Sequence, residues 1–163
     1  MAKNIAQGAL LIGIAVVLQS LRLIIPLPLQ ASTFIIGTLI HMMLTLTVKL
    51  NGLTTAIVLS CILPMFAYAQ GQLMLPLLIP VVILGNTIFV ILLKQFNQGW
   101  QQFLAPIAKA LVMGISTYIL ISFIQFPKPQ MAKLLLFAMT VPQIITGIAG
   151  ILLAKTVQKR LKI

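Results

Sequence analysis

Long apolar runs, interrupted only by single basic residues and short turns, dominate this sequence. Apolar residues make up 61% of its 163 positions, whereas water-soluble domains are typically about 45–50% apolar. A run of about 20 apolar residues is long enough to cross a bilayer as a helix. We therefore expect an all-α membrane bundle, a single transmembrane domain over residues 1–163 that leaves no room for a soluble one.

Six apolar segments have the length of transmembrane helices. Pro26 and Pro28 follow the first segment, and Asn51 with Gly52 marks a tight turn after the second. The first segment has span length rather than signal-peptide length, so we interpret it as an uncleaved helix. Pro64 is expected to kink the third helix. The predicted helices cover residues 5–25, 32–50, 53–69, 77–94, 103–125 and 131–154, followed by a basic tail at 155–163.

All eleven charged side chains are basic, which gives a formal net charge of +11. They are scattered between the apolar runs, so they do not indicate nucleic-acid binding; basic residues instead favour the cytoplasmic ends of membrane helices. With both termini in the cytoplasm, the inner ends hold seven of them and the outer ends three, and this bias predicts a multi-pass protein of the cytoplasmic membrane. The inner seven are Lys3, Lys49, Lys94, Lys155, Lys159, Arg160 and Lys162, and the outer three are Arg22, Lys128 and Lys133.

The remaining basic residue, Lys109, falls inside the fifth segment, where a charge is costly. If the fifth helix begins at Pro106, Lys109 lies in its first turn. Its long side chain can then extend to the cytoplasmic surface. We expect this position rather than a buried functional lysine.

The absence of Asp and Glu excludes most chemistry known for membrane proteins. Ion-coupled transport usually needs carboxylates or histidines in the membrane, and His41 is the only such residue. The sequence has no His–Glu zinc motif and no glycine-rich phosphate loop, and Cys61 is its only cysteine. We therefore expect no enzyme activity, cofactor or metal. A binder powered by another protein, a structural or assembly subunit, and a small facilitator or channel remain as alternatives.

Polar residues are concentrated in the predicted outer half of the bundle. Amides and hydroxyls in lipid must find partners or face a wet cavity. Serine and threonine can bond to their own helix, and amides can pair between helices. The alternative is a pocket, open to the outside, for a small polar molecule. Its candidate substrate-binding residues are Gln19, Arg22, Tyr68, Gln70, Gln72, Asn86, Tyr118, Thr140 and Gln143.

Arg22 and His41 each allow two interpretations. Arg22 either anchors the helix at the interface or binds an anionic ligand group with its planar guanidinium. Because no carboxylate is present to bind a cation, the composition favours a neutral or anionic substrate. His41 precedes Met42 and Met43, but three adjacent residues do not share a helix face. We therefore expect His41 to be a hydrogen-bonded residue of the bundle rather than a metal ligand.

Three stretches make the chain resemble the substrate-binding S component of an energy-coupling factor (ECF) vitamin transporter. They are residues 8–18 (GALLIGIAVVL), 64–72 (PMFAYAQGQ) and 80–86 (PVVILGN). The resemblance covers nearly the whole chain, including its size and six spans. In the first stretch, Ala9 and Gly13 are four residues apart, a spacing that lets helices approach closely in lipid, either within this protein or against another subunit.

The resemblance implies a set of partners and a role for these residues. Ala9 and Gly13 would face a transmembrane coupling subunit, which is driven by a pair of ATPase subunits. The last three helices and the outer loops would bind a vitamin or related small-molecule nutrient. Metal-specific relatives carry histidine after the initiator methionine, and Ala2 at this position puts a nickel or cobalt role in doubt. Thiamine binders commonly use an acidic residue, which this chain lacks.

Overall fold

The computed structural model describes the chain apart from residues 1, 25–27, 74, 97–98, 125–128 and 162–163. Regular secondary structure in the described part is entirely helical, which confirms the predicted all-α fold. The elements are α1 (Ala2–Ile24), α2 (Leu29–Leu50), α3 (Leu53–Ala69), α4 (Leu78–Gln95), the short 3₁₀ helix η1 (Trp100–Phe103), α5 (Leu104–Phe123), α6 (Pro129–Ala138) and α7 (Val141–Leu161).

Five helical segments of the described chain are long and apolar enough to cross a membrane, which indicates a multi-pass membrane protein. They are Lys3–Ile24, Ala31–Leu50, Leu78–Gln95, Trp100–Phe123 and Pro129–Arg160. The sixth apolar helix, α3, has 17 residues and continues through Pro64. A count of six spans therefore stays a prediction.

The last predicted span, residues 131–154, differs from the structure because two helices share it. α6 ends at Ala138 and α7 begins at Val141. Pro142 has no backbone N–H and cannot bond to the carbonyl of Ala138, four residues earlier. The Gln143 Nε2 donates to this carbonyl instead, at 3.4 Å, and Thr140 Oγ1 donates to the carbonyl of Leu136 at 2.8 Å. The Gln143 side chain thus satisfies the carbonyl that the proline leaves open, and the Thr140 hydroxyl satisfies the carbonyl left open where the Thr140 N–H bonds to Phe137 instead.

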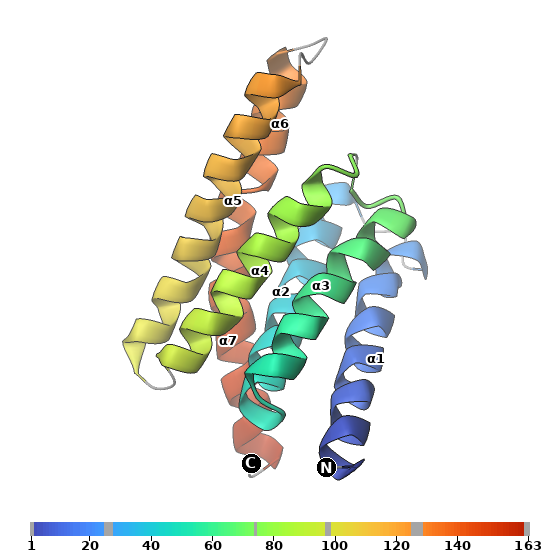
Figure 1. Ribbon diagram of the computed structural model, residues 1–163, viewed down its shortest axis with the longest axis vertical. Helices are drawn as coiled ribbons and strands as arrows, with labels where there is room; N and C mark the ends of the chain where they lie inside the picture. Colours follow the sequence, from blue (N-terminus) through green and yellow to red (C-terminus); the bar gives the residue numbers. More distant parts are fainter. Residues whose placement is uncertain (1, 25–27, 74, 97–98, 125–128, 162–163) are drawn as a thin grey trace.

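Both chain termini lie at one end of the bundle, here called the terminal end, and the opposite end is called the distal end (Figure 1). Helix direction places six of the basic residues toward the terminal end and two, Arg22 and Lys133, toward the distal end. The six are Lys3, Lys49, Lys94, Lys155, Lys159 and Arg160. Lys128 and Lys162 fall outside the described residues. The membrane side on which each end lies remains a prediction.

The terminal half of the bundle is a packed apolar core. Leu44 of α2, Leu59 of α3, Phe89 and Leu93 of α4, and Ile151 of α7 are fully buried there. Such a close-packed interior, with few voids larger than a water molecule, is usual for protein cores.

Small residues decide which helices approach closely and which faces stay open. Gly150 of α7 lies so near α2 that an added Cβ would be 2.5 Å from the His41 Cβ and 2.8 Å from the Met42 backbone nitrogen. Gly13 of α1 has nothing within 4 Å of the same position. Gly13 and Ala9 both lie on the exposed side of α1, so they are not used for packing within this chain.

We predict that Gly150→Ala destabilises the protein by about 1–3 kcal/mol, the usual cost of overpacking a tight contact. The matched control is Gly13→Ala, which gains the same helix propensity but meets no neighbouring atom. Thermal unfolding of both variants in detergent measures the difference. Equal melting temperatures for the two variants would contradict the close approach of α7 to α2.

Candidate functional site

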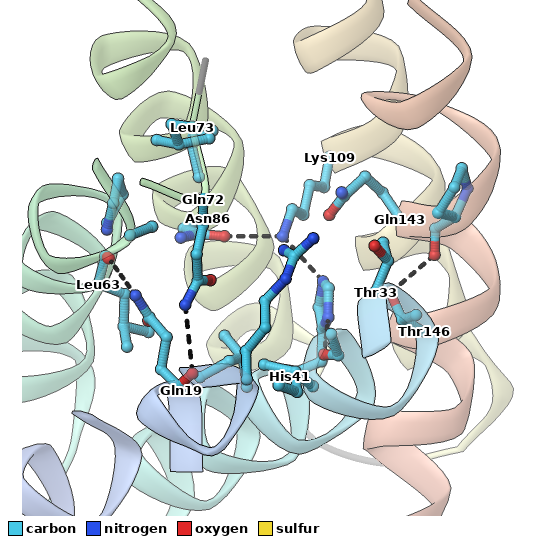
Figure 2. Close-up of a pocket in the computed structure, with 18 residues that line it drawn as sticks. Gln19, Thr33, His41, Leu63, Gln72, Leu73, Asn86, Lys109, Gln143 and Thr146 are labelled. Carbon is cyan, nitrogen blue, oxygen red and sulfur yellow. Dashed lines mark hydrogen bonds between the residues drawn. The ribbon is translucent and has the colours of Figure 1, made fainter. Parts of the chain in front are cut away.

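A cavity of about 160 Å³ lies in the distal half of the bundle (Figure 2). Its 18 lining residues come from α1, α2, α3, α4, α5 and α7 and from the segment after α3. Arg22 and Gln72, both partly exposed, lie toward the distal end. His41 and Asn86, near the middle of α2 and α4, and Lys109, in the second turn of α5, form the floor. The walls between them are largely apolar and include Ile36, Ile40, Leu63, Pro64 and Val82.

Three side chains from three helices meet at the floor of the cavity. The Lys109 Nζ of α5 donates to the Asn86 Oδ1 of α4 at 2.7 Å and lies 2.8 Å from the His41 Nε2 of α2. Figure 2 shows both interactions converging on Lys109. All three side chains are buried, and Lys109 is only 2% exposed. We call these residues the floor cluster.

The hydrogen bonds of His41 assign the role of each ring nitrogen. Its Nδ1 is 2.7 Å from the carbonyl oxygen of Gly37, which can only accept, so this nitrogen carries the proton. The Nε2 is then an acceptor for the Lys109 N–H. Phe89 packs edge-on against the His41 ring, with centroids 5.0 Å apart, and its own centroid is 5.8 Å from the Lys109 Nζ. The aromatic face adds weak attraction for an ammonium.

No anion of this protein accompanies Lys109, because the sequence contains no Asp or Glu. Taking an ammonium out of water costs roughly several kcal/mol even after relaxation, and neutral hydrogen-bond acceptors recover only part of that. Arg22 adds a second basic group to the lining of the same cavity. The cavity is therefore polar at its floor, basic, and without an internal counter-ion.

The position of Lys109 contradicts the expectation that it extends to the cytoplasmic surface. α5 begins at Leu104, after the 3₁₀ turn, so Lys109 lies in its second turn. Ala105, Lys109 and Met113 follow at intervals of four and are all buried, which places Lys109 on the inward face. This spacing was visible in the sequence and could have identified the lysine as buried.

Hydrogen bonds connect α1 with α3 and the segment that follows it. Gln19 Nε2 donates to the carbonyl of Leu63 at 3.0 Å, and Gln72 Nε2 donates to the carbonyl of Gln19 at 3.3 Å. Gln72 Nε2 also donates to Gln70 Oε1, and Gln70 Nε2 donates to Ser20 Oγ, each at 2.7 Å. These contacts fix the wall of the cavity near its distal end (Figure 2).

The structure brings together five of the nine residues named from the sequence as substrate-binding candidates. Gln19, Arg22, Gln72, Asn86 and Gln143 line the cavity. His41 and Lys109, which the sequence analysis did not place in the site, complete its floor. The His41–Lys109 contact joins residues 68 positions apart, so no local pattern could have predicted it.

The other four candidates lie elsewhere. Gln70 does not line the cavity but holds Gln72 in place. Tyr68 is exposed on α3, and Tyr118 is 64% exposed on α5. Tyr118 and Thr140 line a separate, shallow depression between α5 and α6.

His41 is hydrogen-bonded within the bundle, as expected. Within the described part of the chain, no three His, Cys, Asp or Glu residues gather into a group that could hold a metal ion. The chain matches no protein-family model, no curated protein and no solved structure. A function must therefore be inferred from the cavity and its surroundings.

We predict that Asn86→Asp stabilises the ligand-free protein by about 1–3 kcal/mol, because an aspartate of nearly the same shape supplies the missing charge beside Lys109. Asn86→Leu should destabilise it by a similar amount, since Lys109 loses its oxygen acceptor. Thermal unfolding at neutral pH measures both effects. A loss of stability in Asn86→Asp as large as in Asn86→Leu would show that Lys109 does not contact residue 86.

Proposed function

We propose that this protein is the membrane-embedded substrate-binding subunit of an ATP-driven importer of the ECF type. It binds a small neutral or anionic nutrient from outside the cell and delivers it through a coupling subunit and two ATPase subunits. The observation that carries the proposal is the cavity of about 160 Å³ with polar groups at its floor. The lining, mostly apolar with a few placed polar groups, is typical of small-ligand sites.

The location of the cavity supports uptake from one side. It lies toward the distal end, which is the outer end if both termini are cytoplasmic. Below the floor cluster, buried Leu44, Phe89, Leu93 and Ile151 fill the terminal half. This packing argues against a facilitator or channel, which needs a path through both halves. A purely structural subunit would have no use for a basic cavity.

The need for an energy-supplying partner follows from the same composition. The chain has no carboxylate with which to couple to protons or sodium ions. The exposed side of α1 offers a contact surface for such a partner. Ala9 and Gly13 are exposed there beside Leu10 and Val17, and small residues let a second helix approach closely. We propose that the coupling subunit binds this side of α1.

Two measurements on the tagged protein, expressed in its own host, test this function. We expect purification to recover a membrane subunit with two ATPases, and a vitamin screen by thermal shift to find a stabilising ligand. Gly13→Leu should lose the partners because its side chain blocks close helix approach. The control, Ser122→Leu on the exposed surface of α5, should keep them. Failure to recover the ATPases would refute the proposed function, whether or not a vitamin stabilises the protein.

A further inference from the structure

The floor cluster indicates which class of ligand the cavity can bind. We propose that the ligand is a small monoanion and that Lys109 binds its anionic group directly at the floor of the cavity. This inference rests on the proposed function, because it names the substrate class of the same site. It goes beyond that function by choosing between a neutral and an anionic ligand.

The geometry of Lys109 leaves room for a ligand bond. An ammonium has three N–H donors. The His41 Nε2 and the Asn86 Oδ1 take two of them, at 2.8 and 2.7 Å. Lys109 also lines the cavity, so its remaining donor is available to an oxygen bound there. His41 and Asn86 fix the position of the Nζ atom and act as positioning residues.

Charge favours an anion over a neutral ligand. The sequence has no acidic side chain to neutralise Lys109 or Arg22, and both line the cavity. A bound carboxylate would form the only ion pair available at the floor, and charge-assisted hydrogen bonds are roughly twice as strong as neutral ones. A neutral carboxamide of the same shape, in place of the carboxylate, would leave the positive charge of Lys109 without a counter-ion.

The volume of the cavity and its apolar walls limit the size and polarity of the part of the ligand that lies away from the anionic group. A cavity of about 160 Å³ is close to the roughly 150 Å³ that holds one benzene molecule in a protein core. Ile36, Ile40, Leu63 and Val82 supply apolar contacts for such a body. The ligand class is therefore a carboxylate on a single ring or a short chain, with its anionic group toward Lys109 and its apolar part against these walls.

Two matched pairs of single-ring compounds test the inference on the full chain in lipid nanodiscs. The pairs are nicotinate with nicotinamide and benzoate with benzamide, and equilibrium dialysis at fixed pH and salt gives each Kd. We expect at least one carboxylate to bind ten-fold or more tightly than its amide. Lys109→Met should abolish this preference, and Lys109→Arg should retain part of it. Lys133→Met, at an exposed lysine of α6 away from the cavity, is the control and should leave the preference unchanged.

Asn86→Asp is a second variant that does not depend on losing the lysine. Its aspartate would neutralise Lys109 within the protein, so carboxylate affinity should fall at least ten-fold while the fold is kept. The inference is overturned if neither carboxylate binds more tightly than its amide, or if the Lys109→Met and Asn86→Asp proteins keep the preference. Tight amide binding together with copurifying ATPases would overturn this inference alone. Carboxylate binding through Lys109 without any ATPase partner would instead refute the proposed function alone.

Discussion

The contact of Lys109 with His41 and Asn86 is the interaction on which the distal half of the bundle depends. It joins α2, α4 and α5. Gly85 lets α4 approach α5, because an added Cβ there would collide with Met113. Gly150 of α7 lets that helix pack against α2 at His41. Tight packing thus holds a buried cation in an interior that supplies no counter-ion. The cavity of the distal half therefore has a basic group at its floor.

Much of the fold could be predicted from the sequence because apolar length fixes where membrane helices run. The segments 32–50, 53–69 and 77–94 agree closely with α2, α3 and α4. The last segment was less predictable, since it is interrupted between Ala138 and Val141, just before Pro142, and the side chains of Thr140 and Gln143 bond to carbonyls at the interruption. The hydrophobic pattern of the sequence shows how long an apolar segment is. It does not show which backbone carbonyls find another donor next to a proline.

Several residues that line the cavity could be named from the sequence, but their contacts with one another could be predicted only in part. Asn86 and Gln143 were expected to line a pocket or pair between helices, and each does some of both. The prediction that Lys109 reaches the surface is wrong because it assumed a helix start at Pro106; α5 begins at Leu104, and Lys109 lies one turn further in, on the buried face. Its partner His41 lies on a helix far away in the sequence, and contacts of that range arise from tertiary packing. The contact between Lys109 and His41 therefore needed the structure.

Solid-state NMR in lipid bilayers can measure directly whether Lys109 is buried against His41 in the membrane. His41 is the only histidine of the chain, so its ring signals need no further assignment. With ¹⁵N-labelled lysine and ¹³C-labelled histidine, we predict a through-space correlation between one lysine Nζ and the His41 ring, which Lys109→Arg removes. Lysine Nζ signals that correlate only with water and lipid phosphate would contradict this account.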